Sequence, residues 1–172
     1  LYVAVSTDTG CFQYSNTTAD THRVAAALMD TGIDVFPLNK RHFRTKSWAR
    51  LQVERLLTER MHRYEGGKIA VAPVSLSLMD EAGATEEDME DIAAFLGQIE
   101  GVETSVTIRE LAEGGCKLSV RTSGGLNATK VCALLGGGGH AAAAGCTVEA
   151  PWAEARERIL AAVAQVAPDY QR

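Results

Sequence analysis

The 172-residue sequence predicts an α/β fold, and three observations support that prediction. Short runs of valine, isoleucine and leucine alternate with segments that repeat apolar residues every three to four positions, as strands and helices do. Two alternating runs flank a glycine-rich turn, which is typical of a hairpin. Apolar residues make up 46% of the chain, enough for the core of one domain or two small ones.

Composition excludes several classes of protein. The 17 basic and 22 acidic residues give a net charge of −5, which disfavours sequence-blind coating of nucleic acid but allows a local basic cleft. No apolar run reaches the roughly 18 residues of a membrane span. The four cysteines form no C-x-x-C pair, so a zinc knuckle is not expected. Scattered cysteines without a signal peptide predict a cytoplasmic protein.

The first 38 residues predict a strand, a helix and a short apolar piece. The chain opens without methionine on five apolar residues, so residues 1–5 read as a buried strand and the chain as the C-terminal part of a longer protein. Asp8 follows in a polar turn at the strand's carboxyl end, where parallel sheets bind ligands. Residues 18–21 open a helix that Gly32 ends.

Residues 40–63 carry eight lysines and arginines against two glutamates and predict a basic connecting helix. Val53 and Leu57 begin an apolar stripe along one side of it. This helix is interpreted either as the wall of a nucleic-acid groove or as a solvated helix between domains. Two glycines, Gly66 and Gly67, mark a boundary after it.

The second half predicts strand–helix–strand–strand–helix–strand–helix. Alternation and apolar runs indicate the strands, and Thr85, Asn127 and Pro151 stand where helices begin. The expected strands are residues 69–74, 102–108, 116–120 and 146–148, and the expected helices start at 85, 127 and 151.

The strongest chemical signal is four consecutive glycines, residues 136–139, followed by His140. Glycines expose backbone N–H groups, and a helix beginning near His140 would direct more N–H groups to the same point, a combination that binds phosphate. A flexible linker is the simpler alternative. Arg121 and Ser123 close a nearby strand and can grip phosphate, although an exposed arginine in a glycine turn is equally ordinary. Asp8 is either a turn former or a metal ligand.

These motifs resemble the DHH/DHHA1 phosphoesterase family. Residues 8–12, 14–18 and 21–23 resemble the end of its catalytic domain, and residues 136–140 with 143–145 resemble the glycine signature of its DHHA1 domain. The similarity is greatest to the bacterial nano-RNase and phosphoadenosine-phosphate phosphatase branch. It implies the last strand–helix portion of a DHH domain (1–39), a basic linker helix (40–66) and a mixed-sheet DHHA1 domain (67–172).

The resemblance also implies functional roles. Asp8 matches a ligand of a two-manganese cluster, while the sites matching substrate contacts are Arg121, Ser123, Gly137, Gly138, Gly139 and His140. The parent would hydrolyse short oligonucleotides, nucleoside bisphosphates or cyclic dinucleotides. The chain contains no Asp-His-His triplet, so we expect it to lack tightly bound manganese and hydrolase activity on its own.

Two rival functions remain open at this point. One is a non-catalytic RNA-binding or association module, as at the end of alanyl-tRNA synthetases. The other is a structural domain whose glycine loop only makes a turn. A strand at residues 1–38 without its parent sheet would also expose apolar edges, which predicts a homodimer or a domain swap.

Overall fold

The computed structural model describes residues 1–167 of the chain. It contains two compact units, Leu1–Lys46 and Ser47–Arg172. The predicted division at residues 39 and 66 stays a prediction.

All the regular secondary structure of the first unit is helical. It comprises α1 (Tyr2–Asp8), α2 (Ala19–Met29), α3 (Val35–Asn39) and a π-helical turn, Lys40–Arg44. The strand predicted at residues 1–5 is therefore wrong. No strand of this unit offers these residues a partner, and a helix satisfies their backbone groups internally.

Threonine hydroxyl groups in α1 and at its C-cap form hydrogen bonds with carbonyl oxygens one turn earlier in the chain. Thr7 Oγ1 donates to the carbonyl oxygen of Val3 at 2.8 Å, and Thr9 Oγ1 donates to that of Val5 at 2.7 Å. The predicted start of α2 is confirmed, because Thr18 and Thr21 form a reciprocal capping box. The apolar residues of α2 are only partly buried, with Ala25 in the interior and Val24 about half exposed.

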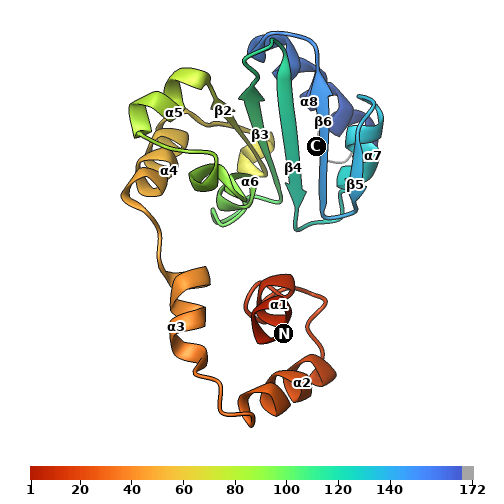
Figure 1. Cartoon of the computed structure of the whole chain (residues 1–172). Helices are drawn as coiled ribbons and strands as arrows, with labels where there is room; N and C mark the ends of the chain where they lie inside the picture. Colours follow the sequence, from red (N-terminus) through yellow and green to blue (C-terminus); the bar gives the residue numbers. More distant parts are fainter. Residues whose placement is uncertain (168–172) are drawn as a thin grey trace. The chain divides into compact units, whose positions relative to one another are not determined.

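The second unit is built on a six-stranded sheet (Figure 1). The strands are β1 (His62–Tyr64), β2 (Ile69–Val74), β3 (Thr104–Glu110), β4 (Cys116–Thr122), β5 (Gly138–His140) and β6 (Ala143–Val148). Their order is β1-β2-β3-β4-β6-β5. Because β2 and β3 are parallel and all other neighbours are antiparallel, the sheet is mixed, which confirms the predicted fold class.

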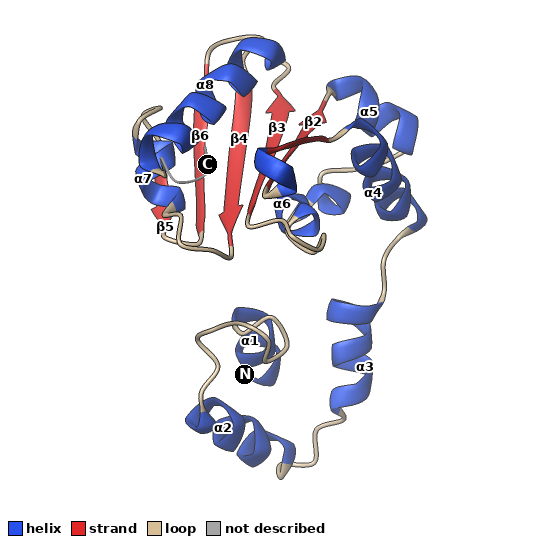
Figure 2. Ribbon diagram, turned by 180° about the vertical axis from the view of Figure 1, so that it is seen from behind, coloured by secondary structure: helices blue, strands red, loops and turns tan. Residues whose placement is uncertain are grey.

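Helices cover the two faces of the sheet unequally. On one face, α7 (Ala128–Ala133) and α8 (Trp152–Val166) pack on residues from β2 to β6 (Figure 2). On the other face, α4 (Trp48–Arg60), α5 (Leu76–Ala82) and α6 (Ile92–Leu96) enclose a second core with β2. Figure 1 looks onto this second face and shows β4, β6 and β5 with no helix of the unit in front of them. We call this area the open face.

Two of the predicted helices differ from those in the structure. The helix expected over residues 40–63 is interrupted, because α4 begins only after Ser47, whose hydroxyl accepts from the Arg50 N–H at 2.9 Å. Val53 and Leu57 are fully buried in α4, as the stripe predicted. The helix expected from Thr85 is a 3₁₀ turn, Glu87–Met89, followed by the short α6.

The second unit also contains a helix, α5, that the sequence did not predict. The segment α5 starts at Ser75, whose hydroxyl accepts from the Leu78 N–H, and ends at Gly83 in a left-handed conformation. Among residues 1–167, no helix combines the length and apolar character needed to cross a bilayer.

Candidate functional site

Strand pairing places Arg121 and His140 in one row across the sheet. His140 of β5 lies opposite Ala143 of β6, and Ala143 lies opposite Arg121 of β4. Directly paired residues of antiparallel strands project from the same face. At about 4.8 Å per strand, the Arg121 and His140 backbones are about 10 Å apart. Two residues that are 19 positions apart in the sequence therefore face the same space.

Alternation along the strands identifies that space as the open face. Val120 and Ala144, the neighbours of Arg121 and Ala143, are buried in the core beneath α7 and α8. Since successive side chains of a strand point to opposite faces, Arg121 and Ala143 point away from those helices. His140 is exposed and the Arg121 side chain is about one-third exposed, 34%. Both are thus accessible to a ligand.

The glycines ahead of His140 form a strand edge, and no helix begins at His140. A Cβ at Gly137 would lie 2.2 Å from the Gly145 carbonyl oxygen, and one at Gly139 would lie 2.6 Å from that of Ala143. Gly137 and Gly139 therefore let β5 lie close against β6. The predicted helix N-terminus beside the glycine loop is wrong, because these residues pair with β6 instead.

Gly138 differs from its two neighbours. It pairs with Gly145, and a Cβ there would meet nothing within 4 Å. Its partner Gly145 belongs to the open face, since Ala144 and Cys146 on either side of it are buried beneath α7. Only the small Ala143 stands between Arg121 and His140, and the adjoining row on the same face consists of Gly145 and Gly138 beside Ser119. This part of the face has no bulky side chain, which leaves room for a ligand to approach the backbone.

The turn after His140 is fastened to neighbouring elements. The carbonyl oxygen of Ala141 accepts from the Ala128 N–H at 2.8 Å and from the Thr122 hydroxyl at 3.3 Å. The Thr122 N–H also donates to the Ala142 carbonyl oxygen at 3.0 Å. These bonds hold the β5–β6 turn against the end of β4, so the row containing His140 and Arg121 is fixed from both sides.

Ser123 lies just beyond the end of β4. Its N–H donates to the Glu103 carbonyl oxygen at 2.9 Å, and the residue is exposed. This places Ser123 two positions beyond Arg121, at the same end of the sheet. The sequence-predicted residues of the second unit therefore gather at one corner of the open face.

An acidic residue that the sequence analysis did not select also belongs to this corner. The Arg121 guanidinium lies 3.3 Å from a carboxylate oxygen of Asp91. Asp91 precedes α6 with a φ of 50° and its side chain makes no cap bond to that helix. A non-glycine residue with positive φ is strained. In the sequence, Asp91 was only one member of an acidic run, and nothing there linked it to Arg121.

Asp8 belongs to the first unit, whereas Arg121, Ser123 and His140 belong to the second. It is the last residue of α1 and is exposed. Within residues 1–167, no group of three or more His, Cys, Asp or Glu side chains could hold a metal ion. One carboxylate does not supply the ligands of a manganese centre. The described residues therefore do not fit that metal, and no catalytic step is derived through it.

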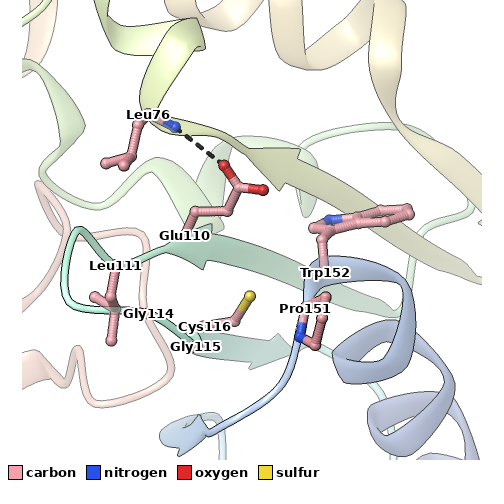
Figure 3. A pocket seen from close by; sticks show the side chains of 8 residues that line it. All are labelled: Leu76, Glu110, Leu111, Gly114, Gly115, Cys116, Pro151 and Trp152. Atoms are coloured by element: carbon pink, nitrogen blue, oxygen red, sulfur yellow. Dashed lines mark hydrogen bonds between the residues drawn. The ribbon is translucent and has the colours of Figure 1, made fainter.

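A cavity of about 200 Å³ lies at the other end of the sheet (Figure 3). Its lining includes Glu110, Cys116 and Trp152, from the β3–β4 hairpin and the start of α8. A Glu110 carboxylate oxygen accepts from the Leu76 N–H at 3.3 Å. Burial, together with the nearby Glu110 charge, raises the pKa of the Cys116 thiol. Since Cys116 and Arg121 are at opposite ends of β4, this cavity is separate from the candidate site.

Comparison with known proteins decides the family. The DHHA1 domain family matches residues 66–168 of the chain. The chain belongs to the DHHA1 family. This confirms the resemblance seen in the glycine signature, and the open face described above lies wholly within the DHHA1 match.

Two proteins illustrate what the DHHA1 chain is similar to. The chain is 40% identical over 161 residues to the bifunctional oligoribonuclease and PAP phosphatase NrnA of Thermus thermophilus, covering 92% of this chain and 47% of that protein. A crystal structure of an exopolyphosphatase-related protein from Bacteroides fragilis has the same fold, with a TM-score of 0.87 and 24% identity over 97% of this chain and 49% of its own.

A pGpG-specific phosphodiesterase, PggH of Vibrio cholerae, is a more distant match. Its TM-score is 0.55 with 14% identity, covering 87% of this chain and 51% of its own. The DHHA1 chain thus spans about half the length of the relatives it matches.

Proposed function

We propose that this chain is the nucleotide-binding part of a phosphoesterase acting on short oligonucleotides, nucleoside bisphosphates or cyclic dinucleotides. The observation that carries the proposal is the shared row of Arg121 and His140 on the open face. Similarity to the Thermus oligoribonuclease and phosphatase supports the choice of substrate class.

The residues of the corner have complementary tasks in this proposal. The Arg121 guanidinium binds the terminal phosphate through paired N–H donors, and the Ser123 hydroxyl adds a further donor. His140 donates from about 10 Å away across the sheet, a separation that accommodates a nucleoside between phosphate and ring. Gly138, paired with Gly145, leaves this part of the open face without side chains that would block the nucleoside. The ion pair between Asp91 and Arg121 must break when a phosphate binds to the guanidinium.

Hydrolysis in this proposal requires the intact parent protein. Manganese would be bound there by Asp8 together with further ligands that residues 1–167 do not supply. We expect the purified 172-residue chain to bind nucleotide without cleaving it. Manganese-dependent cleavage of a dinucleotide by this chain would overturn that expectation.

The test is an amide NMR titration with 5′-phosphorylated diadenylate in the absence of metal. Shifts centred on residues 121–123 and 136–140 are expected, and Arg121→Ala and His140→Ala should each weaken binding by about tenfold. Arg158→Ala is the control, since it removes one positive charge from α8, on the covered side of the sheet. Absence of shifts at millimolar ligand would refute the proposed binding site.

The same titration separates the rival functions. An RNA-binding module of the alanyl-tRNA synthetase type would bind a structured RNA and ignore a dinucleotide. A purely structural domain would bind neither. Self-association through residues 1–38 also stays a prediction, but it no longer has an exposed strand edge as its basis, because these residues are helical where they are regular.

A further inference from the structure

The open face carries a second basic side chain, at the far end of β4 from Arg121. Lys117, Ser119 and Arg121 alternate along this strand with the buried residues Leu118 and Val120. They consequently share the open face. Lys117 is exposed, and the three side chains form a polar line that runs along the whole strand.

The paired residues of β6 and β5 add small or absent side chains beside this polar line. Lys117 pairs with Thr147, and Ser119 pairs with Gly145, which in turn pairs with Gly138. Thr147 is exposed and adds a hydroxyl beside Lys117. Gly145 and Gly138 have no side chains, so the middle of the face is flat between its two charged ends.

The surroundings of Lys117 leave its ammonium accessible. One acidic residue that Lys117 influences is Glu86, whose pKa is lowered first by the hydrogen bond from Arg109 and, to a smaller degree, by the charge of Lys117. The Arg109 guanidinium donates to both carboxylate oxygens of Glu86. Because Arg109 holds this carboxylate, Lys117 retains an exposed positive charge at its end of the face.

The separation of Lys117 and Arg121 matches more than one nucleotide. Four residues along a strand span about 13 Å, and a stacked single strand advances about 3.4 Å per nucleotide. The two cations therefore lie on the order of four nucleotides apart along a stacked strand.

We propose that Lys117 binds a backbone phosphate of a single-stranded oligonucleotide whose terminal phosphate is held at Arg121. The preferred ligand of the open face is then a single strand of roughly three to five nucleotides, with Thr147 and Ser119 as hydroxyl donors along it. This inference rests on the proposed function and deepens it, because a dinucleotide or a nucleoside bisphosphate is too short to reach Lys117.

The experiment compares the affinities of 5′-phosphorylated di- and pentaadenylate for the 172-residue chain and for two variants, by fluorescence anisotropy. Lys117→Gln should weaken pentaadenylate binding by about three- to fivefold and leave diadenylate binding unchanged. It should also reduce the salt dependence of pentaadenylate binding by about 0.7 in the logarithmic slope. Arg158→Gln makes the same change of net charge on the covered side of the sheet and should leave the affinity for both ligands unchanged.

The outcomes distinguish the two proposals. Diadenylate binding that depends on Arg121, together with pentaadenylate binding that ignores Lys117→Gln, would overturn the inference about Lys117 and leave the proposed function intact. Failure of the unaltered chain to bind either ligand would overturn both. Equal weakening of both ligands by Lys117→Gln would also overturn the inference, because the effect would then be a general charge effect and not a second phosphate contact.

Discussion

Substitution of Gly137 by alanine tests whether the glycines serve the pairing of β5 with β6. The added Cβ would lie 2.2 Å from the Gly145 carbonyl oxygen, 2.4 Å from the Cys146 Cβ and 2.7 Å from the Cys146 Cα. Two of these three atoms belong to the β6 backbone and cannot rotate away. Relief therefore requires β5 to move by about 1 Å from β6, since ordinary carbon contacts are about 3.5 Å or longer.

The magnitude follows from what that movement breaks. Forcing extra atoms into a packed region costs about 1–3 kcal/mol. The loss is limited at the upper end, because β5 is a three-residue edge strand that can detach without unfolding the rest of the sheet. At roughly 2–4 °C per kcal/mol for a chain of this size, Gly137→Ala should lower Tm by on the order of 5 °C.

Thermal unfolding followed by circular dichroism measures the loss, and amide hydrogen exchange locates it at residues 138–140 and 143–145. Gly138→Ala is the matched control, because its Cβ enters open space and should change stability by less than about 0.5 kcal/mol. Equal stability of the two variants, with β5 amides protected in both, would show that the close approach at Gly137 does not exist.

Three further outcomes follow from single contacts. Asp91→Asn removes the carboxylate that lies 3.3 Å from Arg121 and should raise the affinity for 5′-phosphorylated diadenylate about two- to fivefold, measured by NMR titration; an unchanged or lower affinity would contradict competition. Hydrogen bonds from the Ser47 hydroxyl and, to a smaller degree, from the Thr85 backbone N–H lower the pKa of Asp88. The ionised Asp88 carboxylate therefore stabilises the fold at neutral pH, and this stabilisation is lost as pH falls below about 4. Urea unfolding at several pH values should therefore show a steeper acid loss for the unaltered chain than for Asp88→Asn, and parallel curves would contradict this. Ile159→Ala, at a fully buried site in α8, should cost about 2–4 kcal/mol in urea unfolding, and a loss below 1 kcal/mol would contradict its place in the core.

Strong local patterns made much of the second unit predictable. Strand β4 alternates between buried and more exposed residues, as its sequence pattern predicted, and α7 begins after Asn127, whose side chain accepts from the Lys130 N–H at 3.2 Å. The last helix begins beside Pro151, and Ala155, Ile159 and Val163, which recur every four residues along it, are buried. In each case the residues that predict the element lie within the element or directly beside it, so no knowledge of distant contacts was needed.

Failures occurred where tertiary surroundings decide the structure. A short apolar run such as residues 1–5 fits a buried strand or a helix equally well, and only the presence of a partner strand distinguishes them. The seven-residue α5 is too short to be stable alone, and it forms because Leu78 is fully buried in the core with α4. Neither signal is contained in the segment itself.

The candidate site was predictable as a set of residues but not as an arrangement. Alternation along β4 placed Arg121 at a strand end, and the glycine run singled out His140. Their common row depends on how β4, β6 and β5 pair, which is a non-local property. Lys117 and Asp91 were missed for the same reason, because only the folded sheet places each of them on or beside the open face.

The pairing register gives the glycine run its physical meaning. Side chains of a strand alternate with a period of two, so a slip of one residue between β5 and β6 would turn His140 towards α7 and away from Arg121. Gly137 and Gly139 fit against the β6 backbone at positions where any Cβ would clash, and they oppose that slip because it would bring other residues into the same contacts. Gly137 and Gly139 are therefore needed for close packing against β6 and not for contact with a phosphate. They affect ligand binding only indirectly, because they fix the position of His140. Gly138, unlike Gly137 and Gly139, faces the space that a ligand would enter, so a side chain at that position should separate loss of binding from loss of fold.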